Sequence, residues 1–414
     1  MTRTLGSYVP KDFGKLLVGG EPLVFHCNHY NYWLQHTLRL NPDVDMDEVI
    51  VAAAEEAAYA QLGAISAELE LGDAAARLAM AGDVFSQQGF GVIDFSGASD
   101  EGGTVRTPVS HYGDMLKAAC EGEIKRRQNL FDEGFAAAAL AIANGRPAGS
   151  YVATKVECKS VGASEGRFEF ALRPEPLALP KSPGQGHHES LELPSPAEGT
   201  SVDEPAILQA LAGLDFSGNE EGLTPRFGVI LTHHYSNFYN RAAFEFARRM
   251  SELGMADMAD DLLVEAGHRC AFNTFGGIMT SAEWEAVVQP QCATREDWIH
   301  GIVAVVNALG WGVWRVHELT PDSLTIRIYD DYEGSAHRGM HGNASRPMNH
   351  LAQGGVAGLM NLVYVGDILA KPALDAALYE RVFEHEDRFV AKTTQSLSMG
   401  AGFTEIVAKR GQGG

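Results

Sequence analysis

Two short stretches of the sequence concentrate imidazole and phenol side chains, FHCNHYNYW at 25–33 and THHYSNFYN at 232–240. Neutral imidazole nitrogens are good ligands for iron, zinc or copper. If the two stretches meet in the fold, their histidines can share one metal ion, so we expect a transition metal, iron or zinc. The candidate ligands are His26, His29, His233 and His234. Two alternatives stay open: the rings line a polar ligand pocket, or they pack in the core and cap helices.

Four tyrosines close to histidines or carboxylates in the sequence are candidate catalytic residues, because a phenol beside such a group can donate or accept a proton. They are Tyr30, Tyr235, Tyr112 and Tyr332. Amide, aromatic and charged side chains of the same segments and of two later helices are candidate ligand-binding residues. They are Asn31, Asn237, Trp33, Tyr239, His111, Glu133, His350 and Gln353. The alternative for the group around Tyr112 and Tyr332 is that its polar side chains cap helices or lie in solvated loops.

The familiar catalytic and nucleotide-binding motifs are missing from the sequence. No Walker-type GxxxxGK[ST], no GxGxxG after a strand, no HExxH and no GxSxG occurs. We therefore expect no nucleotide cofactor. Cys27 follows His26 directly, but adjacent residues rarely face each other, so the pair does not indicate a cysteine nucleophile.

The elements around the His/Tyr-rich stretches must position them. Each stretch follows an apolar strand-like run and precedes a helical pattern, so we expect both to form turns between a strand and a helix. The segment at 333–347 is rich in Gly, Ser and Asn and predicts a long loop, either a lid or a mobile surface loop. Lys125, Arg126 and Arg127 are expected on a solvated helix face.

The sequence repeats itself on either side of a Pro-rich break. Six pairs of segments recur in the same order at a nearly steady spacing. The pairs are 21–35 with 225–241, 49–65 with 262–278, 85–95 with 306–316, 110–114 with 330–335, 130–140 with 350–360, and 155–172 with 393–408. Repeats of this length are duplicated domains rather than a solenoid. Two copies of one fold usually pack about a pseudo-two-fold axis, which would bring the His/Tyr-rich stretches together.

The break between the copies gives the domain boundaries. Residues 174–224 are dense in Pro, Ser, Gly and Glu and predict an extended linker. Within it, Asp203 and Pro205 mark the start of a short helix at 203–214. The first domain is then 1–173 and the second is 225–414.

The second copy resembles the 4-vinyl reductase domain family. The motifs are GWGV at 310–313 opening a strand, DDYEGS at 330–335 and the glycine-rich HLAQGGVAGLM at 350–360. The first copy repeats the order with GFGVIDF, VSHYG, EGFAAAAL and VECKSVGASEGRFEF, and the matched parts cover about two-thirds of the chain. The resemblance implies an α+β fold of two tandem homologous domains. Each would be an antiparallel sheet with helices packed around an apolar pocket, and the two would form a pseudo-dimer.

The resemblance also implies a ligand. Family members include proteins of bacteriochlorophyll synthesis and sensing domains for aromatic hydrocarbons, which implies a small apolar or aromatic organic molecule as partner. Many relatives hold zinc through a cysteine pair in the closing hairpin. This sequence departs from that pattern, since the first copy has only Cys158 there and the second has Ser396, which puts such a zinc site in doubt. No evident ATPase or helix-turn-helix segment accompanies the two copies.

Composition narrows the class of protein. Of 414 residues, 45% are hydrophobic and 21% charged, and 32 Lys+Arg against 54 Asp+Glu give a net charge of −22. Such a surface repels phosphate backbones and anionic lipids, so we expect neither nucleic acid nor a membrane as partner. The sequence has no secretory signal, no apolar run of transmembrane length and five widely spaced cysteines, which favours a cytoplasmic protein. A homo-oligomer stays open.

These features lead to two functional hypotheses. The first is a small-molecule enzyme, a metal-dependent oxidoreductase or hydrolase, acting on an apolar or aromatic substrate at His-rich turns between the repeats. The alternative is a non-catalytic binding, carrier or sensor protein for a hydrocarbon or a tetrapyrrole-like ligand. The clustered histidines favour the enzyme, and the family resemblance and the missing catalytic motifs favour the binding protein.

Overall fold

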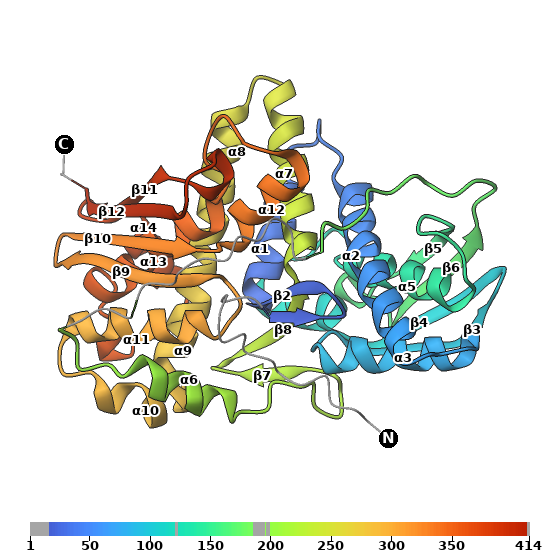
Figure 1. Ribbon diagram of the computed structural model, residues 1–414, viewed down its shortest axis with the longest axis horizontal. Coiled ribbons are helices and arrows are strands. Elements are labelled where there is room, and N and C mark those ends of the chain that lie inside the picture. The colour runs from blue at the N-terminus through green and yellow to red at the C-terminus, as the bar shows by residue number, and fades with distance from the viewer. Residues whose placement is uncertain (1–15, 121–122, 185–194, 196–198, 412–414) are drawn as a thin grey trace.

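The computed structural model describes residues 16–120, 123–184, 195 and 199–411, and over these residues it is an α+β structure with three antiparallel four-stranded sheets. One sheet lies in the centre, and the other two lie on opposite sides of it (Figure 1). In order across the sheet, the central strands are β1 (Leu16–Val18), β2 (Glu21–Cys27), β8 (Val229–Tyr235) and β7 (Thr224–Arg226). Strands from before and after the linker therefore pair with each other.

The two outer sheets share one strand order. The first runs β3 (Gly91–Ser99), β4 (Gly102–Ser110), β6 (Gly166–Leu172) and β5 (Tyr151–Glu157). The second runs β9 (Val313–Thr320), β10 (Ser323–Tyr329), β12 (Thr404–Arg410) and β11 (Phe389–Gln395). Each consists of two hairpins joined through their second and fourth strands. The prediction of antiparallel sheets with packed helices is confirmed.

Helices fill the space around the sheets and between them. Those that precede β7 are α1 (Asn28–Leu38), α2 (Asp47–Glu68), α3 (Ala74–Gln87), α4 (Leu116–Ala119), α5 (Leu130–Ala143) and α6 (Glu204–Ala212). Those that follow β8 are α7 (Ser236–Glu252), α8 (Ala256–Cys270), α9 (Gly276–Thr280), α10 (Ala282–Val287), α11 (Arg295–Asn307), α12 (Tyr332–His341), α13 (His350–Tyr364) and α14 (Ala376–Phe383). None of the described helices is both long enough and apolar enough to cross a bilayer.

Glycine sets how closely two pairs of helices approach. A Cβ atom at Gly354 of α13 would lie 2.1 Å from the backbone oxygen of Val264 in α8. A Cβ atom at Gly134 of α5 would lie 2.3 Å from the backbone oxygen of Val51 in α2. Real Cβ atoms do not come this close to a carbonyl oxygen, so only glycine permits these helix pairs to touch. The Ala/Gly-rich sequences of α5 and α13 therefore permit their close packing on α2 and α8.

The first helix of each half packs on both halves. The helix α1 packs on α8 of the second half, and α7 packs on α2 of the first half. Figure 1 shows the result, with β2, β8 and the start of α1 in the middle of the molecule. The core is consequently shared by both halves.

Two predictions about the chain around the histidines and after Tyr332 are wrong. The His/Tyr-rich stretches are not turns, because β2 ends at Cys27 and α1 begins at Asn28, and β8 joins α7 in the same direct way. Most of 333–347 is the helix α12 rather than a loop. It forms because the Asp331 carboxylate accepts hydrogen bonds from the backbone N–H groups of Glu333 and Gly334, at 2.8 and 3.0 Å.

The expected helix face at Lys125–Arg127 is also wrong. These residues belong to an irregular segment before α5. Arg126 pairs with Asp47 at 3.2 Å, and Arg127 pairs with Glu133 at 2.6 Å. The two arginines therefore form local ion pairs, and Lys125 and Arg126 are exposed to solvent on an irregular segment rather than on a helix.

The short helix expected near 203–214 is α6. Its start follows the predicted chemistry, since the Asp203 carboxylate accepts a hydrogen bond from the Ala206 N–H at 3.1 Å and Pro205 lies in the first turn. Residues 185–194 and 196–198 of the expected linker lie outside the described part of the chain.

Candidate functional site

The pairing of β2 with β8 decides which histidines meet. The register places Val24 opposite His234 and His26 opposite Thr232. Because side chains alternate along a strand, His26 and His234 lie on one face of the central sheet and His233 lies on the other. His233 stacks on Phe25, with 4.3 Å between the ring centroids. The three strand histidines therefore divide between two environments.

His26 and His234 have matching surroundings contributed by the opposite halves. Nε2 of His234 lies 2.8 Å from the Tyr112 hydroxyl, and its ring centroid is 4.9 Å from that of Phe90. Nε2 of His26 lies 3.3 Å from the Tyr332 hydroxyl, and its ring centroid is 4.9 Å from that of Trp311. Each histidine thus enters the core of the half to which it does not belong.

Backbone contacts repeat in the same way. The N–H of Phe25 donates to the Leu309 carbonyl at 2.9 Å, and the N–H of His233 donates to the Gln88 carbonyl at 2.8 Å. In each case the strand residue before the buried histidine binds the residue before a Gly-aromatic-Gly motif. Equivalent residues of the two repeated segments therefore make equivalent backbone contacts.

Tyr239 and Asn31 lie between the two histidines. The Tyr239 ring is 4.8 Å from the His26 ring and 4.6 Å from the His234 ring. Its hydroxyl donates to Oδ1 of Asn31 at 2.6 Å. The Asn31 amide nitrogen lies 2.9 Å from Nε2 of His111. One buried network therefore joins eight of the predicted site residues, one of them Tyr30, whose ring is 4.2 Å from His26. The other seven are His26, His234, Tyr112, Tyr332, Tyr239, Asn31 and His111.

Burial keeps this network uncharged. Desolvation lowers the pKa of His26 and His234 well below the usual histidine value and that of His111 to about 3. It also raises the pKa of Tyr112 and Tyr332 well above the usual tyrosine value. Neutral imidazoles and phenols can hydrogen-bond to a ligand and can transfer a proton. Both His26 and His234 are completely buried, so a ligand reaches them only if the core opens.

The positions of His26, His29 and His233 bear on the metal site predicted from the sequence. Nδ1 of His26 lies 3.8 Å from Sγ of Cys270, within hydrogen-bonding range for a sulfur atom. Among the residues that the structure describes, no group of three or more His, Cys, Asp or Glu side chains has the geometry to hold a metal ion. His233 faces away from His234, and His29 lies half-buried in the first turn of α1.

The remaining predicted residues have separate partners. The Tyr235 hydroxyl donates to Gln61 at 2.8 Å, and the Asn237 amide donates to Glu21 at 3.0 Å. Trp33 lies under the Arg269 guanidinium, whose carbon is 3.9 Å from the ring centroid. His350 pairs with Asp260 at 2.7 Å, and Glu133 pairs with Arg127 at 2.6 Å. The first three contacts join the two halves, the other two each lie within one half, and the five do not converge on one point.

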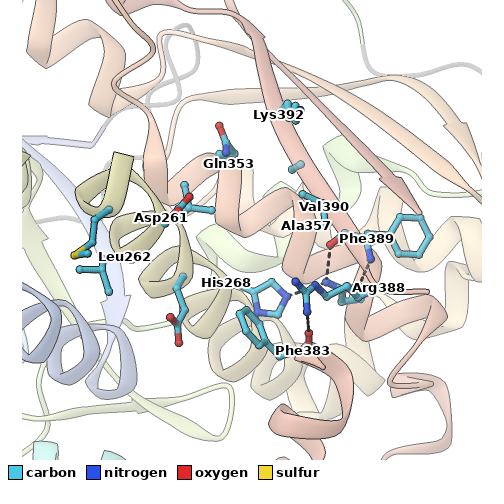
Figure 2. Close-up of a pocket in the computed structure, with 15 residues that line it drawn as sticks. Asp261, Leu262, His268, Gln353, Ala357, Phe383, Arg388, Phe389, Val390 and Lys392 are labelled. Atoms are coloured by element: carbon cyan, nitrogen blue, oxygen red, sulfur yellow. Dashed lines mark hydrogen bonds between the residues drawn. The ribbon is translucent and has the colours of Figure 1, made fainter. Parts of the chain in front are cut away.

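Gln353, another of the predicted ligand-binding residues, lines a different site, which is an open cleft of about 720 Å³ in the second half. The cleft lies between α8, α13 and the start of β11, with the end of α14 below (Figure 2). Its lining is Met258, Asp261, Leu262, Val264, Glu265, His268, Gln353, Ala357, Asn361, Phe383, Arg388, Phe389, Val390, Ala391 and Lys392. Just over half of these side chains are apolar, and the polar ones come from α8, α13, β11 and the segment before β11.

The hydrogen bonds at the base of the cleft fix the tautomer of His268. Oδ1 of Asn361 accepts from the Phe389 N–H at 2.6 Å, and Nδ2 of Asn361 donates to the Phe389 carbonyl at 3.1 Å, so the amide has one orientation. The same Nδ2 lies 2.9 Å from Nε2 of His268, which must therefore accept. The proton is on Nδ1, and Nδ1 is buried with no hydrogen-bond partner among the described residues.

Electrostatics near His268 favour its neutral form. Burial, helped by Arg269 and Arg388, lowers the pKa of His268 to about 4. Figure 2 shows the Arg388 guanidinium beside the imidazole ring, and its Nη1 donates to the Phe383 carbonyl at 2.5 Å. At neutral pH a neutral, buried N–H donor therefore lies next to a fixed positive charge at the base of the cleft.

Sequence reasoning missed His268, Asn361 and Arg388. His268 is at the position that matches Glu55 in the repeat, and that change from carboxylate to imidazole was the one available signal. The other two residues lie in α13 and in the segment between α14 and β11, far apart along the chain. Only the packing of these elements makes them neighbours.

Comparisons with known proteins do not establish the function of this chain. No protein-family model matches the chain, and no curated protein matches it. A similar solved structure is the phenol-responsive sensory domain of the transcription activator PoxR with phenol. The likeness has a TM-score of 0.30 and 12% sequence identity, and it covers 41% of this chain and 74% of that chain.

Proposed function

We propose that this protein binds a small organic molecule with an apolar body in the cleft between α8, α13 and β11, and acts as a carrier or sensor. The observation that carries the proposal is the cleft itself, about 720 Å³ in volume and open to solvent. Ligand sites for small molecules occupy roughly 300–1,000 Å³ and combine apolar walls with a few placed polar groups. Leu262, Val264, Phe389 and Val390 supply the walls, and His268 supplies an unused donor.

The matching region of the first half is closed, which supports a binding role for the open one. There Glu55 replaces His268 and accepts a hydrogen bond from the Gly149 N–H at 2.7 Å. Burial raises the pKa of both the Glu55 and the Glu133 carboxyl, and the nearby Arg173 charge opposes that rise. The chain after β6 continues past this point, and the Leu177 N–H donates to the Gly149 carbonyl at 2.9 Å. One site per chain follows.

A fluorescent apolar probe tests the proposal. N-phenyl-1-naphthylamine is neutral and becomes bright in apolar clefts. Val390 is 50% exposed at the edge of the cleft, so Val390→Trp places an indole in the opening without disturbing the core. We expect this variant to bind the probe about tenfold more weakly, a loss of about 1.4 kcal/mol.

The matched control for this experiment is Val161→Trp, since Val161 is 46% exposed and far from the cleft in the first half. It should bind the probe as the wild type does, with one probe per chain. Equal affinity in Val390→Trp and wild type would reject the cleft as the binding site.

A second candidate function uses the buried His/Tyr network, as an enclosed metal-assisted or polar ligand site of an enzyme. The observation in its favour is that Nδ1 of His111, Nδ1 of His234 and Oδ1 of Asp132 are buried without hydrogen-bond partners in the described part of the chain. Native proteins rarely leave such atoms unpaired, so a bound group would satisfy them. A ligand can reach this buried network only if the core opens, and we therefore prefer the open cleft as the binding site.

A further inference from the structure

The cations in the cleft are its least explained feature. Arg388 and Lys392 both line it, and neither forms an ion pair with any residue that the structure describes. Arg388 is held in place instead by the Phe383 carbonyl and by the Phe383 ring, 5.0 Å from the guanidinium carbon. Most arginines of this chain that line other pockets are tied to a carboxylate, as Arg241 is to Glu56. A positioned and unpaired guanidinium is typical of an anion site.

Charge is divided between the two walls. The carboxylates Asp261 and Glu265 lie on the α8 wall, and Glu265 is paired with Arg269 at 3.2 Å. The cations lie on the opposite side, at the start of β11 (Figure 2). An anionic group is therefore attracted to the β11 side and kept from the outer part of α8. The apolar lining leaves room for a hydrophobic body between them.

The imidazole of His268 adds a directional hydrogen-bond donor beside the positive charge. Its Nδ1–H has no partner among the described residues, and its ring is next to Arg388. An N–H donor and a guanidinium side by side match the two oxygens of a carboxylate. We propose that the ligand of this cleft is an amphipathic carboxylate, whose oxygens are bound by Nδ1–H of His268 and by Arg388 while its apolar body lies along Leu262 and Val390. This inference rests on the proposed function.

The first half shows why only one copy would take an anion. In the place of His268 it has Glu55, and in the place of Gln353 it has Glu133. Two carboxylates there would repel a ligand carboxylate, and Arg173 already faces both of them. The duplicated unit thus offers one anion-binding cleft per chain.

A matched pair of probes tests the inference on the full chain. 2-Naphthoate carries a carboxylate, and methyl 2-naphthoate has nearly the same shape without the charge. We expect wild type to bind 2-naphthoate at least about tenfold more tightly than the ester by calorimetry at neutral pH, since hydrogen bonds to charged groups are worth about that much. In Arg388→Gln the affinity for 2-naphthoate should fall by about tenfold, and the affinity for the ester should change by less than about twofold.

Control variants and the alternative outcomes separate the two proposals. Arg381→Gln removes an exposed arginine of α14 that does not line the cleft, and it should leave both affinities unchanged. Thermal unfolding checks that Arg388→Gln is folded, and Lys392→Gln provides a second test at an exposed position. If wild type binds both probes equally, the carboxylate inference is overturned while the apolar cleft stands. If neither probe binds, the proposed function itself fails.

Discussion

Gly354 and Gly355 are neighbours in α13, and the structure predicts opposite effects when each is replaced by alanine. In a helix interior alanine is better than glycine by roughly 1 kcal/mol. At Gly355 the nearest atom to a new Cβ is Cη2 of Trp314, 3.7 Å away, which is an ordinary contact. Gly355→Ala should therefore raise the free energy of unfolding by up to about 1 kcal/mol.

Gly354→Ala should do the reverse. Its Cβ would lie 2.1 Å from the Val264 oxygen and 2.5 Å from the His268 nitrogen, both backbone atoms of α8 that cannot rotate away. Relief requires α8 and α13 to separate, and overpacking of this kind costs about 1–3 kcal/mol or more. After the propensity gain, we expect a net loss of roughly 2 kcal/mol.

Urea unfolding followed by tryptophan fluorescence measures both variants. Because α8 and α13 form two walls of the cleft, Gly354→Ala should also change the affinity for N-phenyl-1-naphthylamine, whereas Gly355→Ala should not. Equal unfolding free energies for the two variants would refute the close approach of these helices and, with it, the shape of the cleft.

Two further predictions concern buried groups. Burial raises the pKa of Glu55 from 4.5 to about 7, so between these pH values the folded state holds a proton that the unfolded chain releases. The free energy of unfolding of the wild type should therefore fall relative to that of Glu55→Gln as pH rises from 4.5 through about 7. A constant difference between the two proteins across that range would contradict this. For the second candidate function, a metal in the enclosed site would be seen by elemental analysis of the purified protein as iron or zinc that is lost in His234→Ala. Metal-free protein with full ligand affinity would remove the metal version of the second candidate.

Much of the fold was accessible from the sequence because local signals agreed with the tertiary structure. Asp203 caps α6 as its residue type indicates, and the glycines of 350–360 permit the contact with α8. The repeated segments fall on elements that occupy the same order in both outer sheets. The pairing of β2 with β8 was not readable, because strand pairing over so long a separation leaves no local pattern.

The candidate site was only partly accessible for a related reason. The sequence identified His26, His234, Tyr112 and Tyr332 as a group, and the structure brings them into one network. It also suggested His233, which strand alternation turns to the opposite face. At 333–347 the Gly-, Ser- and Asn-rich composition predicted a loop, but the Asp331 side chain caps the start of a helix there. The cleft combines single residues from α8, α13 and the segment before β11, and no spacing in the sequence marks such a set.

The most direct test of the account is an experimental structure of the protein with 2-naphthoate bound. We predict one naphthoate per chain between α8 and β11, with its carboxylate oxygens within hydrogen-bonding distance of Nδ1 of His268 and the Arg388 guanidinium. A naphthoate enclosed instead between His234 and Tyr112, with the cleft free of ligand, would contradict the account.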